Sequence, residues 1–403
     1  MATVKKHEEK RAWSSWAIFV LCLFPTGLAA ATKSDDNAAL LYYQAFIRCP
    51  PFDSFPSEVQ SAVFQGTAAA KDVTKYVEQS RDVIELIEAG SRISRCDWVI
   101  PPQHVGSMEN SVALRVKTVL LLVGADARIL VAGGYYRKAF ERILTLRRFA
   151  VHVTNDPNLC MEIPLMVEDI AMKFTSDVLG VMPPERETLT WLNAQLTYES
   201  AVYESLMSVL WTYYRETLLR LRADREWLPH VRTFVPRMST ETYRAKQKAW
   251  DGLGDDELVR IIGERDVEFL NAVAKTLAGD MLYEQKCTRL DELDKVLTDE
   301  AKDNPAIIAN WTMEARTIVP RYSNSVRTKA RFNALHAAIG VYLTKAEKGQ
   351  LPEDLPSTAS KDPFSGKDFG YERTPSGFIL RCRIKPVEQD KRWEFEFKVR
   401  EKN

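Results

Sequence analysis

The sequence predicts a mainly α-helical protein, in which a multi-helix body precedes a small C-terminal three-stranded antiparallel β unit packed on the last helix. From Asp36 to about Pro320, apolar residues recur at helical spacing, with few alternating β-branched runs. From Phe369 to Val399, apolar residues instead alternate with polar ones, as in strands that bury one face. The chain has 403 residues, more than the ~250–300 at which a single core stops growing, so we expect more than one structural unit.

The charge balance argues against a nucleic-acid partner. The chain carries 55 basic and 55 acidic residues, so it has no net field that would attract nucleic acid or an anionic surface. A composition of 45% hydrophobic and 27% charged residues is ordinary for a globular protein. We therefore expect a protein partner, which the sequence does not identify, and no nucleic acid.

Residues 1–31 have the order of a secretory signal peptide. Four basic residues lie among the first eleven, an apolar run follows from Trp16 to Leu28, and three alanines end at Ala31. Cleavage there would begin the mature chain at Thr32, and the protein would be exported to the periplasm or secreted. The alternative is an uncleaved membrane anchor, but the run is shorter than the ~20 residues of a spanning helix and Pro25 interrupts it. No later stretch is apolar enough to span a bilayer, so we expect no stable span after cleavage.

Residues 32–320 form the predicted all-α body, which is divided by proline-containing breaks. The segment from Pro184 to Trp227 has no Pro or Gly after its start, so we predict one helix of ~40 residues, ~60 Å long. Its apolar stripe begins with Leu192 and Leu196 and reads as a core-facing surface. The breaks fall at Cys49-Pro50-Pro51, in a loop from Trp98 to Asn110, at Pro183-Pro184, from Leu228 to Thr240 and near Asn304-Pro305.

Residues from Val112 to Asn155 are typical of a helical hairpin that turns at Gly133-Gly134. Ala139 and Ile143 follow at the small and large positions of the second helix of a tetratricopeptide repeat. No second clear copy follows at the period of about 34 residues that this repeat has. We therefore predict a lone repeat-like hairpin rather than a repeat array.

Residues 321–403 form the predicted C-terminal unit. Its helix runs from about Ser325 to Lys348 and ends at Gly349. A turn at Thr374 to Gly377 separates the first two of three strands that alternate apolar and polar residues. We expect Phe364, Phe369 and Tyr371 to lie over Leu335, Ile339 and Tyr342 of the helix, and Glu394, Glu396 and Lys398 to face outward.

The C-terminal unit resembles the soluble region of the major pseudopilins of type II secretion. The resemblance covers about Arg327 to Leu380 and rests on the helix, on Leu351-Pro352, on Asp362-Pro363-Phe364 with Gly366, and on Tyr371. The family begins with a prepilin-peptidase site and a membrane helix joined to this region, whereas here some three hundred residues precede it. Filament assembly is therefore not implied.

The chain as a whole is similar to a set of uncharacterised exported bacterial helical proteins that carry such a C-terminal unit. Cys96-Asp97-Trp98, the hairpin around Gly134 and Ala139, and Leu146-Arg147-Arg148 carry this resemblance. It implies a fold and an exported location, and no activity.

The sequence contains no recognisable motif for binding a metal or a cofactor. Removal of Cys22 with the signal peptide leaves five cysteines without Cys-x-x-Cys spacing, which we interpret as buried single thiols, with a Cys49–Cys96 disulfide as the open alternative. No His-Glu-x-x-His, Gly-x-Ser-x-Gly, phosphate loop or dinucleotide fingerprint is present. We assign no metal-binding or cofactor-binding residue and expect no cofactor. The remaining cysteines are Cys49, Cys96, Cys160, Cys287 and Cys382, and the histidines are His7, His104, His152, His230 and His336.

One acidic pattern bears on the hypothesis that the protein is an enzyme. Tyr198-Glu199-Ser200 resembles the Glu-Ser of lytic transglycosylases, exported helical enzymes that use a single Glu as general acid and base. That family continues into a Gly-Leu-Met-Gln-like segment, whereas here Leu206 to Tyr214 extends a helix, which favours a solvated carboxylate on a polar face. Glu168, Asp169 and Glu199 are the carboxylates to replace first, and none is assigned as catalytic.

The sequence therefore favours a non-enzymatic, exported helical binding or scaffold protein. Stacked helical pairs expose grooves that bind partner segments, and no catalytic constellation is visible. Two alternatives stay open: a cell-wall peptidoglycan hydrolase that uses a single Glu, and an accessory protein of a secretion machinery.

Overall fold

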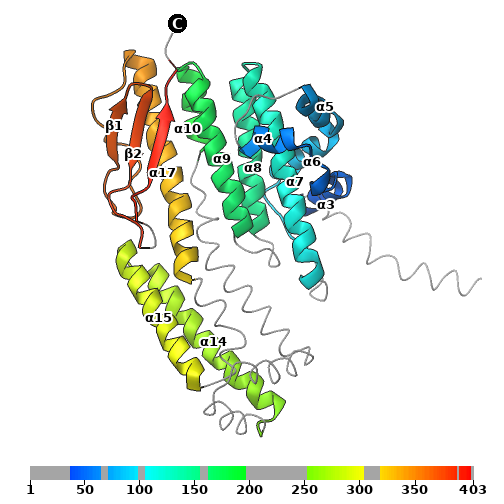
Figure 1. Cartoon of the computed structure of the whole chain (residues 1–403), viewed down its shortest axis with the longest axis vertical. Coiled ribbons are helices and arrows are strands. Elements are labelled where there is room, and N and C mark those ends of the chain that lie inside the picture. The colour runs from blue at the N-terminus through cyan, green and yellow to red at the C-terminus, as the bar shows by residue number, and fades with distance from the viewer. Residues whose placement is uncertain are drawn as a thin grey trace, which may run out of the picture.

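The computed structural model confirms the mainly helical prediction and the small antiparallel sheet at the C-terminal end (Figure 1). No helix in the described parts of the chain is long and apolar enough to cross a membrane. The structure describes residues 37–64, 71–98, 105–154, 162–196, 252–303, 318–387 and 390–400.

The first helices form a small group on one side of the molecule (Figure 1). α3 packs against α6, and α4 and α5 pack against the long helix α7 (Val105–Ala132). Asn37 caps α3, because its side-chain oxygen accepts a hydrogen bond from the Ala39 N–H at 3.2 Å. The elements are α3 (Ala38–Arg48), the short 3-10 helix η1 (Phe52–Ser54), α4 (Ser57–Phe64), α5 (Lys71–Gln79) and α6 (Arg81–Ser91).

α7 (Val105–Ala132) and α8 (Tyr136–Thr154) form the predicted hairpin, and α9 (Glu162–Val181) packs against α8. The turn lies at Gly133-Gly134 as predicted, where Gly134 has a φ of +77°, a conformation that suits glycine. Ala139 and Ile143 are both buried. The predicted loop from Trp98 to Asn110 is wrong from Val105 onward, because the helix already begins there and includes Gly106, which a helix tolerates at about 1 kcal/mol relative to Ala.

α10 (Arg186–Gln195) is shorter than predicted. The single helix expected from Pro184 to Trp227 is wrong at Leu196, whose backbone (φ −81°, ψ 56°) leaves the helical region. The absence of Pro and Gly permits a helix without requiring one, and tertiary packing overrides local propensity. Leu192 and Leu196 are buried as predicted, and the rest of the stripe lies outside the described residues.

α14 (Asp255–Ala278) and α15 (Tyr283–Asp303) pair with each other, and α15 also packs on α17 (Ile318–Lys348). The Tyr283 hydroxyl lies 2.7 Å from the Ser323 hydroxyl oxygen at the α15–α17 contact. α17 includes Pro320, whereas the sequence predicts a helix that starts near Ser325. Pro320 lies in the first turn of the helix as described, where a missing backbone N–H removes no intrahelical bond.

The sheet consists of β1 (Gly370–Thr374), β2 (Gly377–Arg381) and β3 (Glu394–Lys398) in that order, all antiparallel. One face packs on α17, where the Tyr342 and Phe378 rings meet with centroids 5.6 Å apart. β3 also contacts α9, so the unit touches a helix of the body as well as α17. Glu394, Glu396 and Lys398 are exposed on the other face as predicted.

The partner of the Tyr342 ring differs from the prediction. Phe378 is fully buried between Tyr342 and Phe397, whereas Tyr371 is half-buried at the sheet edge and donates its hydroxyl hydrogen bond to the Pro352 carbonyl at 3.0 Å. The Tyr371 ring lies beside Phe378, with centroids 5.7 Å apart, so the central strand β2 and not β1 supplies the ring that packs on Tyr342.

Candidate functional site

The Asp362-Pro363-Phe364-Ser365-Gly366 turn, which the sequence singled out, is a folding element. Asp362 is completely buried. One carboxylate oxygen accepts the Phe364 N–H at 3.0 Å, and the other accepts the Ser365 hydroxyl at 2.7 Å and the Arg383 N–H at 2.9 Å. The Gly366 N–H closes the turn on the Asp362 carbonyl at 2.8 Å, with Gly366 at a φ of +69°. These bonds compensate the buried charge and tie the turn to the end of β2.

Glu168 lies buried at the junction of α8, α9 and α17. Its Oε1 accepts hydrogen bonds from Arg147 Nε at 2.8 Å and is paired with Nη2 at 2.7 Å. The Arg147 guanidinium in turn stacks over the Phe332 ring of α17, 5.0 Å from its centroid. Glu168 and Arg147 therefore connect all three helices.

Asp169 makes the neighbouring connection on the same junction. Its Oδ2 lies 2.5 Å from Arg331 Nη1 of α17. Within the described residues, Glu168 Oε2 and Asp169 Oδ1 are buried without a hydrogen-bond partner. A general acid must come within hydrogen-bond reach of the substrate proton, and Glu168 is only 4% exposed. A large substrate such as a cell-wall polymer has no access to Glu168 in this arrangement.

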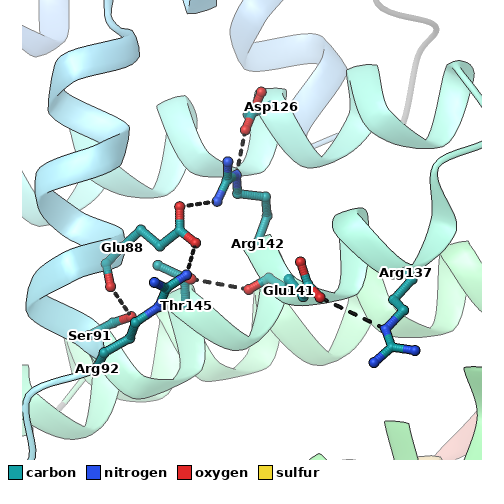
Figure 2. A network of polar contacts seen from close by, with 8 residues as sticks. All are labelled: Glu88, Ser91, Arg92, Asp126, Arg137, Glu141, Arg142 and Thr145. Carbon is teal, nitrogen blue, oxygen red and sulfur yellow. Dashed lines mark hydrogen bonds and ion pairs between the residues drawn. The ribbon is translucent and has the colours of Figure 1, made fainter. Parts of the chain in front are cut away.

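A second polar network, which the sequence analysis missed, joins α6, α7 and α8 (Figure 2). Arg142 donates from Nε to Asp126 Oδ2 at 2.7 Å and forms a second ion pair with Glu88. Asp126 also pairs with Arg81 at 3.0 Å, and Glu88 with Arg92. Burial acts to lower the pKa of Arg142, but the hydrogen bonds and charges of Asp126 and Glu88 outweigh it and raise that pKa.

The sequence contained one signal of this network. Asp126 interrupts the apolar run from Leu120 to Ile129, and its side chain is 3% exposed. A lone acid in such a run needs a buried cationic partner, because an unpaired buried charge is strongly destabilising. The sequence did not show which arginine would supply it.

A cluster of aromatic side chains lies where α3, α6 and α8 meet residues 96–98. Tyr42 is fully buried, and its ring packs edge-on to Phe149 (4.9 Å) and stacks on Trp98 (5.7 Å). Its hydroxyl lies 2.7 Å from Nδ1 of His152. Trp98 Nε1 donates to the His152 carbonyl at 2.7 Å, which satisfies one of the last carbonyls of α8.

The Cys96-Asp97-Trp98 segment thereby acquires a structural role. The Asp97 N–H donates to the Asn37 side-chain oxygen at 2.9 Å, and the Asn37 side-chain N–H donates to the Asp97 carbonyl at 3.0 Å. These reciprocal bonds hold the segment against the N-terminus of α3, 60 residues away in sequence.

The Cys49–Cys96 disulfide that the sequence left open is not formed, because neither cysteine takes part in a disulfide. They lie in different surroundings: the Cys49 carbonyl accepts from Arg115, whereas Cys96 lies near Tyr42. Burial raises the pKa of the Cys49 thiol to about 12, so it is a poor nucleophile. Cys287 and Cys382 are also buried and outside any disulfide, as predicted, and Cys160 lies outside the described residues.

No metal site is assembled among the residues that the structure describes. No three His, Cys, Asp or Glu side chains in these parts of the chain could hold a metal ion together. Glu199 lies outside the described residues. Comparisons with protein-family models, with curated proteins and with solved structures each found no match. The resemblance to the major pseudopilins thus stays a prediction from the sequence.

Proposed function

We propose that the protein is a non-enzymatic, exported helical binding or scaffold protein. The observation that carries this proposal is the use of Glu168 and Asp169. Both carboxylates hold α8, α9 and α17 together through Arg147 and Arg331, at distances of 2.7 and 2.5 Å. Charged side chains in this arrangement stabilise a fixed geometry of helices, which suits a surface that must be presented to a partner.

Large apolar side chains are exposed on several different elements and offer positions at which binding can be probed. Ile47 of α3 is 83% exposed, and Tyr135 at the α7–α8 turn is 60% exposed. Val296 of α15 is also exposed. Single exposed apolar residues are normal on a protein surface, so the binding face has to be identified by experiment.

Site-specific photocrosslinking would test the binding proposal. A photoreactive amino acid is placed in turn at Ile47, Tyr135 and Val296, which belong to separate elements, and the cells are irradiated. The proposal predicts one crosslinked protein, identified by mass spectrometry, at one of these positions and not at the others. Equal capture of many proteins at all three positions, or none at any, would argue against a specific partner.

A peptidoglycan digestion assay would separate this proposal from the hydrolase alternative. Purified mature protein is incubated with peptidoglycan, and released fragments are measured. We expect no release. Release that disappears in Glu199→Gln while persisting in Glu187→Gln would overturn the scaffold proposal and assign a catalytic role to Glu199. The Glu187→Gln variant is the matched control, because the Glu187 side chain is 92% exposed and its removal should leave the fold unchanged.

Export is part of the proposal and rests on residues 1–31. Mass spectrometry of the cell-envelope fraction should find a mature N-terminus near Thr32. Recovery of the full-length chain from the inner membrane would instead show a retained anchor.

A further inference from the structure

The contact between Tyr42 and His152 joins four parts of the N-terminal region. Tyr42 belongs to α3 and His152 to α8, and the Trp98 ring packs on Tyr42 while its indole N–H bonds the backbone of His152. On the α6 side, a Cβ added to Gly90 would lie 2.6 Å from Cε1 of Tyr42, so the two helices meet in close contact. The hydrogen bond between hydroxyl and imidazole is the polar centre of this packing.

The direction of this hydrogen bond follows from burial. Burial, with a smaller contribution from Cys96, raises the pKa of Tyr42 above its usual value, so the hydroxyl keeps its proton. Among the described residues, His152 Nδ1 is the acceptor that this hydroxyl reaches. The hydroxyl therefore donates to Nδ1, and the neutral imidazole carries its own proton on Nε2.

Burial opposes a positive charge on the ring, although His152 lies in the last turn of α8, where the helix dipole favours one. His152 is 6% exposed, and burial lowers its pKa below the usual 6.5. The hydroxyl of Tyr42, which contacts the ring, is neutral because burial raises its pKa, and Cys96 lies near Tyr42. Several charged side chains on the elements packed here form ion pairs of their own, whereas Glu85 of α6 is exposed and Arg148 of α8 lies 3.5 Å from the Gln195 side-chain oxygen. The ion pairs are Arg48–Asp82, Arg92–Glu88, Arg95–Asp97 and Arg147–Glu168.

We propose that the Tyr42–His152 contact is an acid-sensitive latch that holds α3 and residues 96–98 on α8. A proton from solvent would add to Nδ1 of His152. The Tyr42 hydroxyl then loses its acceptor, and a positive charge is left in a buried aromatic site. Both effects favour opening of this contact, because solvent hydrates the imidazolium once α3 has separated.

The sign of the pH dependence is fixed by the lowered pKa. Below 6.5 the opened state binds more protons than the closed state, so the closed state loses stability as pH falls. The loss continues until the pH reaches the lowered pKa of the closed state. Above 6.5 both states are neutral at His152 and the latch is fully stable. This inference concerns regulation of the N-terminal helices and does not depend on the proposed function.

Hydrogen exchange resolved by peptide tests the latch in the full-length mature chain. Protection factors, corrected for the intrinsic exchange rate, are compared between about pH 7.5 and about pH 5, on the two sides of the usual histidine pKa. For peptides covering α3 and residues 93–98, we expect protection to fall by up to about tenfold per pH unit, the slope of one proton. Unchanged protection of these peptides would overturn the proposal.

Two substitutions give the controls. His152→Asn keeps an acceptor near the position of Nδ1 but does not titrate, so its α3 protection should be independent of pH over this range. The same acid-induced loss in His152→Asn would overturn the proposal. His336→Asn removes another partly buried histidine whose pKa burial lowers, and it should leave the response of α3 unchanged.

A titration of the wild-type protein keeps the test decisive if His152→Asn fails to fold. The imidazole signal of His152, assigned by its displacement in Tyr42→Phe, is followed by NMR as pH falls. Loss of α3 protection over the pH range in which this signal titrates supports the latch. Loss over a different range assigns the opening to another group and rejects it.

Discussion

The α6–α7–α8 contact and the C-terminal sheet are held together by different physical means. In the first, Arg142 bridges Glu88 and Asp126 across three helices. In the second, aromatic rings fill the space between sheet and helix, and the buried Asp362 bonds mainly to the backbone. Helices that meet through apolar stripes can pack in several registers, whereas side-chain alternation and the connecting turns already fix the register of a sheet. We interpret the buried ion pairs as the element that selects one helix arrangement.

The largest effect is expected at Gly377, at the start of β2. A Cβ there would lie 2.0 Å from the Phe397 carbonyl oxygen of β3, and backbone atoms do not yield as the end of a side chain does. Gly377→Ala should make residues beyond Gly349 protease-sensitive while the helical body stays folded.

Gly340 in α17 provides the matched control. An added Cβ would meet its nearest neighbour, Cγ of Pro356, at 3.7 Å, an ordinary contact. Gly340→Ala should stabilise the protein by up to about 1 kcal/mol through helix propensity. A Gly377→Ala protein with wild-type proteolysis would show that the strands separate at this point without loss of the sheet.

Phe378 should be more important than Tyr371 for the C-terminal unit. Phe378→Ala removes a fully buried ring between Tyr342 and Phe397, and such a change costs about 3–5 kcal/mol. Tyr371→Ala removes a half-buried ring and should cost less. Limited proteolysis in increasing urea would rank the two variants, and a reversed order would place the core of the unit at the sheet edge.

Arg142→Met should destabilise the helical body by about 3 kcal/mol, the lower end of the range for breaking one side of a buried pair, because Arg81 and Arg92 still contact the two acids. Urea unfolding followed by circular dichroism measures this change. Arg260→Met is the control: Arg260 pairs with Glu257 and Glu264 on the surface of α14, and its loss should leave the midpoint unchanged. Equal effects of the two variants would show that burial adds nothing to the Arg142 network.

The smallest effect on stability is expected on the outer face of the sheet. Glu396→Lys changes an exposed side chain, so folding should be preserved. If this face docks on a secretion machinery, Glu396→Lys should abolish capture of the partner. Glu394→Lys is a less clear test, because Glu394 forms an ion pair with Arg381 at 2.7 Å. Unchanged capture by Glu396→Lys would argue against docking through this face.

The sequence predicted the C-terminal unit more accurately than the helical body. Alternation along Phe378, Leu380, Phe395 and Phe397 has a period of two, which leaves one choice of buried face, and the turn before Gly377 set the register. Helix ends were less certain, because the signals at Gly106, Leu196 and Pro320 permit more than one boundary.

The polar contacts between helices could not be predicted in the same way. Asp126 was visible as a charge in an apolar run, but its partner Arg142 depends on the pitch and crossing of α7 and α8. The Tyr42–His152 pair joins residues 110 positions apart, and no local pattern encodes such a contact. The sequence singled out Glu168 and Asp169 only as carboxylates to replace first, and it did not show that both face arginines.

The contact of β3 with α9 has a consequence for the order of folding. Gly180 lies against Lys398, whose carbonyl accepts from Tyr342, and Arg400 donates to the Val181 carbonyl 219 residues earlier. While the chain is being synthesised, this flank of α9 therefore stays uncovered until residues 398–400 have left the ribosome. Contacts of such long sequence separation slow folding. A nascent chain that pauses before β3 would present an uncovered helix flank, which is the kind of surface that chaperones bind.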